Sequence, residues 1–135
     1  MTQPTKRWLN KAAEDFRVLR REFRNTEEPA YNAICFHAQQ CVEKLLKGFL
    51  QENQIHFPKS HDIRELINFA LPIRPEWEKL KASANVLTRY AVDSRYPDDE
   101  AYREDAEEAV STCEKLRRII LDDLESLDQL RLSSD

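Results

Sequence analysis

Glycine is almost absent from this chain, because its 135 residues include only one, Gly48. A glycine-rich phosphate-binding loop needs several glycines, so a nucleotide site of that kind is excluded. Tight hairpin turns also depend on glycine, and no useful stretch alternates apolar and polar residues as a strand does. Alanine, leucine, glutamate, lysine and arginine dominate the composition, and these residues favour helices. We therefore predict an all-α fold.

Cysteines and long apolar runs are also scarce. The three cysteines, Cys35, Cys41 and Cys113, are odd in number and widely spaced, so we predict buried thiols rather than a disulfide framework. No Cys-X-X-Cys pair and no pair of histidines four residues apart occurs, so we expect neither a metal site nor a cofactor. No apolar run approaches the roughly 20 residues that span a bilayer. We therefore expect a cytoplasmic protein that makes no membrane contact.

Apolar residues at helical spacing predict an up-and-down bundle of about five helices. We expect it to form one domain over residues 1–135, with frayed ends at about 1–5 and 131–135. The predicted helices run from about Lys6 to Arg24, from Pro29 to about Gln54, from a cap at Ser60 through Ala70, from near Pro75 through Ala91, and onward from a cap at Asp98 or Asp99.

Charge is unevenly distributed along the chain. Residues 1–24 carry seven basic and three acidic side chains, whereas residues 97–135 carry five basic and thirteen acidic ones. We favour the interpretation that the first and last helices lie side by side and complement each other electrostatically. The alternative is that the basic first helix contacts RNA or DNA, although no known nucleic-acid motif accompanies its charge.

The second predicted helix combines a wide apolar arc with one polar stripe. His37, Gln40, Lys44 and Lys47 are spaced by three, four and three residues, so they lie on one side of the helix, with Glu43 beside them. A helix with so broad an apolar arc must be enclosed on most sides. Its polar stripe is therefore either a solvated face or the lining of a groove. Gly48 interrupts this helix, and we predict that it lets a neighbouring element approach closely.

Two further polar patches lie at predicted helix ends. Ser60-His61-Asp62 precedes the third helix, and Arg95-Tyr96-Pro97 follows the fourth. Each has a plain structural interpretation, as a helix cap and as a turn. The alternative is that His61, Lys44, Lys47 and Arg95 converge on one anion-accepting groove. Lysine and arginine suit phosphate there, and Tyr96 offers a stacking ring.

At these residues the chain resembles the HEPN domain family, named for higher eukaryote and prokaryote nucleotide-binding. The resemblance rests on four segments taken in order: Phe36-His37-Ala38-Gln39-Gln40, Glu43-Lys44-Leu45-Leu46-Lys47, Ser60-His61-Asp62-Ile63 and Ser94-Arg95-Tyr96-Pro97-Asp98. It implies a helical bundle that usually dimerises, and it implies a partner that is a minimal nucleotidyltransferase. The family-like polar positions that it carries over as ligand-binding candidates are His37, Gln40, Glu43, Lys44, Lys47, His61, Arg95 and Tyr96.

The chain departs from the family's ribonucleases. Those members use an arginine, four to six intervening residues and a histidine, and none of His37, His56 and His61 has an arginine at that distance before it. We therefore assign no catalytic residue and do not carry over enzymatic activity.

Our functional hypothesis is a HEPN-type protein that acts with a minimal nucleotidyltransferase in a toxin–antitoxin or defence-type module and binds a nucleotide or nucleic acid. One alternative is a metal-independent RNase toxin, with His61 or His37 as general base. The other is a purely structural interaction or dimerisation module. We also expect a homodimer, because Trp8, Trp77, Phe36 and Tyr31 exceed what one bundle core needs.

Overall fold

The computed structural model describes residues 1–90 and 100–133, with side chains through residue 130. This part contains five α-helices, one 3₁₀ segment and no β-strand, which confirms the all-α prediction. The elements are α1 (Gln3–Arg24), α2 (Tyr31–Glu52), α3 (Ile63–Ala70), η1 (Pro75–Lys79), α4 (Leu80–Thr88) and α5 (Arg103–Ser133). The predicted site residues Arg95 and Tyr96, the predicted caps Asp98 and Asp99, and Ala91 lie outside the described residues.

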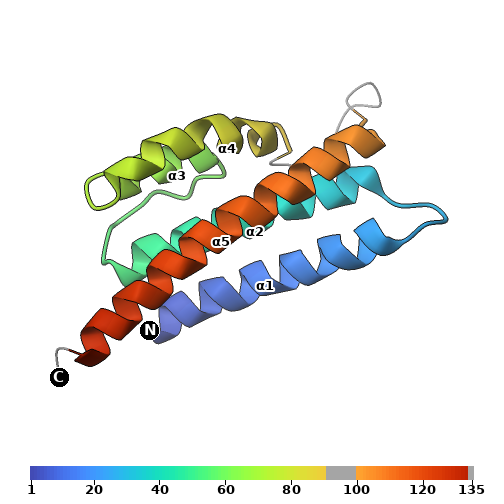
Figure 1. Cartoon of the computed structure of the whole chain (residues 1–135). Helices are drawn as coiled ribbons and strands as arrows, with labels where there is room; N and C mark the ends of the chain where they lie inside the picture. The colour runs from blue at the N-terminus through green and yellow to red at the C-terminus, as the bar shows by residue number, and fades with distance from the viewer. Residues whose placement is uncertain (91–99, 134–135) are drawn as a thin grey trace.

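Helix α2 is the centre of the bundle and contacts α1, α3, α4 and α5 (Figure 1). Helices α1 and α2 form an antiparallel pair, whereas α3, η1 and α4 cover another side of α2. The predicted apolar arc of α2 is buried, and its members are Ile34, Ala38, Cys41, Val42, Leu45, Leu46 and Phe49. The three cysteines are also buried, and none of them forms a disulfide. Enclosure of α2 therefore follows from the width of its apolar arc.

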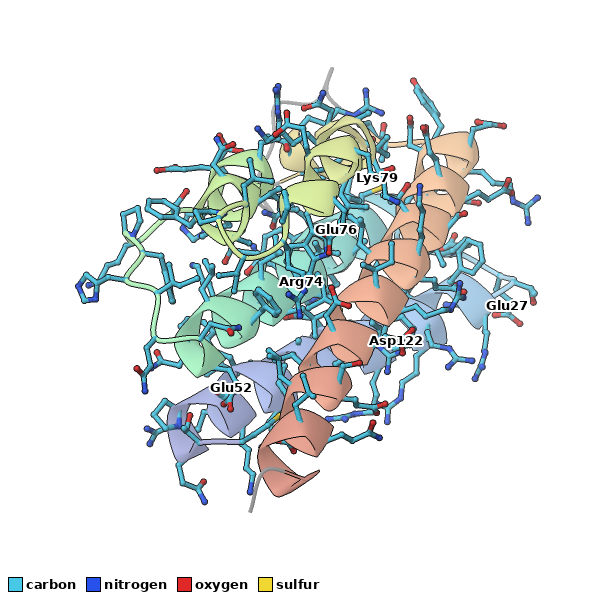
Figure 2. The ribbon with its side chains drawn as sticks, turned by 60° about the vertical axis from the view of Figure 1, so that its left-hand side comes forward. Glu27, Glu52, Arg74, Glu76, Lys79 and Asp122 are labelled. Carbon is cyan, nitrogen blue, oxygen red and sulfur yellow. The ribbon has the colours of Figure 1, made fainter. Side chains whose placement is uncertain are left out.

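Helix α1 starts three residues before the predicted Lys6. The Thr2 hydroxyl accepts a hydrogen bond from the Thr5 N–H at 3.3 Å and so caps the helix. The Thr2 N–H donates to a Glu52 side-chain oxygen at 3.1 Å, and the Met1 amino group pairs with Asp128 at 3.1 Å. Glu52 lies at the end of α2, beside the start of α1 (Figure 2). These contacts attach the first residues of the chain to α2 and α5.

Three other helix starts also differ from the predictions, each at a proline or a cap. Helix α2 begins at Tyr31 rather than Pro29. Pro75 begins the tight η1 turn, and the regular α4 starts only at Leu80. Helix α5 starts at Arg103, after the predicted caps. Proline sets φ and removes an N–H donor, which is compatible with a turn as well as with a first helical residue, so it marks these boundaries only approximately.

One aromatic residue that we assigned to an intermolecular surface belongs to the core. The Trp77 side chain is buried, and its ring centroid lies 4.5 Å from that of Phe49. Its Nε1–H donates to an Asp123 side-chain oxygen at 3.0 Å. Arg74, labelled in Figure 2, contacts the same oxygen at 3.2 Å. Trp77 therefore joins η1 to α2 and α5, so the expected surplus of aromatic side chains is smaller than the sequence indicates.

Gly48 lies where α1 approaches α2 closely, as predicted. A β-carbon at this position would lie 3.1 Å from Leu9 Cδ2 and 3.4 Å from Trp8 Cβ. Both neighbours belong to α1. The missing side chain of Gly48 therefore leaves room for Leu9.

The fit between Gly48 and Leu9 predicts that their substitutions are energetically coupled. Replacing a helical glycine by alanine stabilises a helix by about 1 kcal/mol. In the wild-type background we expect Gly48→Ala to show less than half of this gain, because the new methyl group displaces Leu9. In a Leu9→Ala background the full gain should appear. Urea unfolding of the four proteins of this double-mutant cycle measures the coupling, and equal gains in both backgrounds would contradict the packing role.

Candidate functional site

A narrow strip of α2 remains accessible between α1 and the segment that joins α2 to α3. Its members, all only partly buried, are Phe36, His37, Gln40 and Lys44. The residues on either side of the strip, among them Gln39 and Glu43, are buried. The polar stripe predicted from the sequence therefore lines a surface between two neighbouring segments instead of facing open solvent.

Asp15 of α1 binds two strip residues at once. One of its carboxylate oxygens lies 2.7 Å from His37 Nδ1, and the other accepts a hydrogen bond from Lys44 Nζ at 2.5 Å. The Asp15 residue is 7% exposed, so this carboxylate is almost removed from water. These contacts orient the His37 ring and the Lys44 ammonium group from the buried side of the strip.

The environment of Asp15 stabilises its charged form. Burial on its own disfavours the carboxylate and would raise its pKa. Hydrogen bonds from His37 and Lys44, together with the charge of Lys44, outweigh this effect and lower the pKa of Asp15 below its ordinary value. Asp15 is therefore an anion at neutral pH.

Glu43 builds a second cluster of the same composition. Its carboxylate oxygens lie 2.8 Å from His61 Nδ1 and 3.3 Å from Lys47 Nζ. Glu43 is 2% exposed and Lys47 6%, and the Lys47 ammonium lies 5.4 Å from the centre of the Trp8 ring. Each cluster thus combines one buried carboxylate, one histidine and one lysine. The two carboxylates balance the charges of the two lysines.

Two glutamines connect the strip to the segment before α3. The Gln39 side-chain amide donates to the His61 carbonyl oxygen at 2.9 Å and to Glu43 at 3.4 Å. The Gln40 amide donates to the Gln39 side-chain oxygen at 2.7 Å. This chain of hydrogen bonds holds the backbone of His61 against α2.

Asp62, rather than the predicted Ser60, is the N-cap of α3. Its side chain accepts hydrogen bonds from the N–H groups of Arg64 and Glu65. Ser60 instead accepts from the Asp62 N–H at 3.0 Å and donates to the Glu65 carboxylate at 2.8 Å. The cap fixes the end of the segment from which His61 reaches Glu43.

The described site residues thus form two groups, each centred on a carboxylate, and the predicted convergence with Arg95 lies outside the described residues. His37 and Lys44 gather at Asp15, whereas Lys47 and His61 gather at Glu43. Sequence reasoning missed Asp15 and Gln39. The signal for Asp15 was present, because its spacing from Ala12 and Leu19 places a carboxylate on the apolar side of α1.

Each histidine uses Nδ1 to contact its carboxylate. Within the part of the chain that the structure describes, neither Nε2 has a hydrogen-bond partner. His37 also lies against the edge of Phe36, with ring centroids 5.3 Å apart. A carboxylate contact at one ring nitrogen fixes the ring orientation and leaves the other nitrogen for a ligand.

Over residues 1–90 and 100–130, no three His, Cys, Asp or Glu side chains gather as metal ligands would. None of the described helices has the length and apolar character needed to cross a bilayer.

Comparison with known proteins identifies the family from the sequence and a shared fold from the structure. A model of the HEPN domain matches residues 5–127. The chain belongs to the HEPN domain family. Its fold is similar to that of TT1696 from Thermus thermophilus, with a TM-score of 0.70 and 27% sequence identity over 90% of this chain and 98% of that one. A search of curated proteins finds no significant match.

The Asp15 contacts predict a specific loss of stability in acid. Since its pKa is lowered in the folded HEPN chain, Asp15 contributes stability that is present above its unfolded pKa and is lost as the pH falls through the folded pKa. Asp15→Asn should cost about 2 kcal/mol at pH 7, because His37 and Lys44 lose a buried ionic partner. The difference from wild type should shrink below about pH 4.

Urea unfolding between pH 7 and pH 3 measures this effect. Glu14→Gln is the matched control, because Glu14 is the exposed neighbour of Asp15 on α1. A difference between Asp15→Asn and wild type that stays constant with pH would contradict the ionic role.

Proposed function

We propose that this HEPN protein binds a phosphate-bearing ligand, a nucleotide or RNA, along the accessible strip of α2, and that it works with a minimal nucleotidyltransferase in a toxin–antitoxin or defence-type module. The observation that carries the ligand proposal is the combination of an aromatic ring with oriented polar groups. Phe36 is partly exposed and offers a stacking surface for a base. His37, Gln40 and Lys44 follow it at helical spacing and offer hydrogen bonds to phosphate oxygens.

The free-energy cost of burying the charged groups of the two clusters supports a binding role. Burying a carboxylate or an ammonium group is expensive, and apolar residues of similar size often stabilise a fold equally well or better. Asp15, Glu43 and Lys47 are nevertheless all buried. Their common effect is to hold two histidines and a lysine in fixed positions at the strip. Pairing lowers the pKa of Asp15, and ionisable groups with perturbed pKa values are enriched at functional sites.

The balance of positive and negative charge at the strip affects which class of ligand we expect it to bind. With neutral histidines, Asp15 and Glu43 offset Lys44 and Lys47, so the strip attracts a polyanion only weakly at long range. Short-range hydrogen bonds and stacking must then supply most of the affinity. We therefore expect a defined nucleotide or a short single-stranded RNA rather than nonspecific duplex DNA.

Ligand binding predicts sensitivity at Phe36 and Lys44. Titration of ATP and of a short single-stranded RNA into the full chain should show binding that Phe36→Leu and Lys44→Met each weaken about tenfold, a loss of about 1.4 kcal/mol. Phe69→Leu and Lys81→Met are matched controls, since Phe69 is also partly buried and Lys81 also pairs with a carboxylate, Glu78, at 3.0 Å.

Three results of this titration decide between the candidate functions. Equal affinities of the strip variants, the controls and wild type would overturn the strip as the ligand site. Absence of binding to both ligands would favour the purely structural module. Shortening of the RNA in EDTA would instead favour the metal-independent ribonuclease.

The partner proposal rests on membership of the HEPN family and is tested separately. The chain should elute as a stable complex when it is co-expressed with a minimal nucleotidyltransferase encoded beside its gene. Expression of the chain alone should slow growth, and co-expression of the partner should relieve this effect. An unrelated nucleotidyltransferase is the control. Failure of the encoded neighbour to co-elute would overturn the partnership.

A further inference from the structure

Hydrogen bonds on the buried side of the accessible strip determine which of its atoms accept a hydrogen bond from a ligand. The series begins at the His61 carbonyl oxygen, which can only accept. Gln39 meets this oxygen at 2.9 Å, so the side-chain nitrogen of Gln39, and not its oxygen, must face His61. The Glu43 carboxylate lies 3.4 Å from the same nitrogen and fits this orientation. Gln39 is fully buried, so these two acceptors hold its amide in one orientation.

The orientation of Gln39 determines that of Gln40. The Gln39 side-chain oxygen can only accept, and the side-chain nitrogen of Gln40 donates to it at 2.7 Å. Rotating the Gln40 amide by half a turn would place two oxygens against each other at this distance. The Gln40 side-chain oxygen, Oε1, is therefore held on the other side of the amide, and it has no hydrogen-bond partner among the described residues. Because Gln40 is only partly buried, this oxygen is an acceptor that a ligand can reach.

His37 offers a second acceptor when its ring is neutral. Asp15, whose pKa is lowered, is an anion that can only accept, so the hydrogen in the 2.7 Å contact belongs to His37 Nδ1. A neutral ring with its hydrogen on Nδ1 has a lone pair on Nε2, whereas a protonated ring donates from Nε2 and suits a phosphate oxygen. Gln40 follows His37 by three residues, so the two side chains are neighbours on the surface of α2.

The Gln40 oxygen suits a different part of a nucleotide from the phosphate. Phosphate oxygens are themselves acceptors, so their strongest partner on the strip is the Lys44 ammonium, four residues farther along α2. The groups that complement an acceptor oxygen are N–H donors of the base, such as the exocyclic amino groups of adenine, guanine and cytosine. Phe36 lies against His37 and offers the ring on which such a base stacks. The base and the phosphate therefore have separate partners along the strip.

We propose that Gln40 selects the base of the ligand: its side-chain oxygen accepts a hydrogen bond from an exocyclic amino group, so the strip prefers a nucleotide whose base carries one. This inference rests on the proposed binding of a nucleotide or RNA at the strip, and it adds a direction to that binding. The base lies toward Phe36 at the start of α2, and the phosphate lies toward Lys44. The alternative is that Gln40 only supports Gln39, in which case the amino group of the ligand has no effect on affinity.

Two ligands that differ only in the amino group test the selection. ATP carries an amino group on its base, whereas purine riboside triphosphate has a hydrogen atom in that place and no N–H donor on its base. Calorimetric titration of the full chain at pH 7 should show that ATP binds about fivefold more tightly, as one net hydrogen bond predicts. Gln40→Met removes the acceptor and keeps a side chain of similar length. It should weaken ATP binding to the affinity of purine riboside triphosphate and leave binding of the latter unchanged.

Gln51→Met is the matched control, because Gln51 is another partly buried glutamine of α2, about two turns beyond Lys44. It should keep the preference for ATP, and circular dichroism of both variants should match the wild type. The first comparison uses the wild-type chain, so a folding defect in a variant does not affect it. Equal affinities of the wild type for the two ligands would overturn this inference alone and leave strip binding in place. A preference for ATP that persists in Gln40→Met would also overturn it. Absence of binding to either ligand would overturn the proposed ligand function together with this inference.

Discussion

Enclosure of charged groups around α2 is the constraint on which the rest of this structure depends. Glu43 and Lys47 lie on the same helix as the main apolar arc and are both buried. An ionised group deprived of water needs a partner, or its desolvation costs several kcal/mol. Part of the compensation comes from other segments, from His61 before α3 and from the Trp8 ring on α1. The electrostatic requirement of α2 therefore helps to fix how α1 and the α2–α3 segment pack.

The sequence predicted the helices well because their signal is local. Apolar side chains at spacings of three and four residues predicted the helices, and on α2 they also identified the buried face, which includes Ile34, Val42 and Phe49. Helix starts were less predictable because they depend on long-range contacts. Thr2 caps α1 in a position that Glu52 supports from the end of α2, and no pattern within residues 1–6 contains that information.

The candidate site was predictable in its residues but not in its arrangement. Helical spacing placed His37, Gln40 and Lys44 on one stripe, and the structure keeps them together as an accessible strip. Spacing says nothing about which residue of a neighbouring helix lies opposite. The pairing of Asp15 with Lys44 depends on the register of α1 against α2, to which the close approach of Leu9 to Gly48 contributes. Counting lysines as free cations overstated the positive charge of the site.

Helix α1 carries paired charged groups on the side that faces α2 and exposed arginines on another side. On its α2 side, each ionic contact involves a specific partner, as Asp15 does with His37 and Lys44. On its exposed side, Arg17, Arg20 and Arg24 make no ion pair within the described residues, although neighbouring like charges on a helix repel each other. Contacts of Thr2, Leu9 and Asp15 hold α1 in place without any ion pair from these arginines. Arg20 also packs its guanidinium 5.5 Å from the centre of the Phe16 ring, so at this position the stem and plane of an arginine serve the fold while its charge stays at the surface.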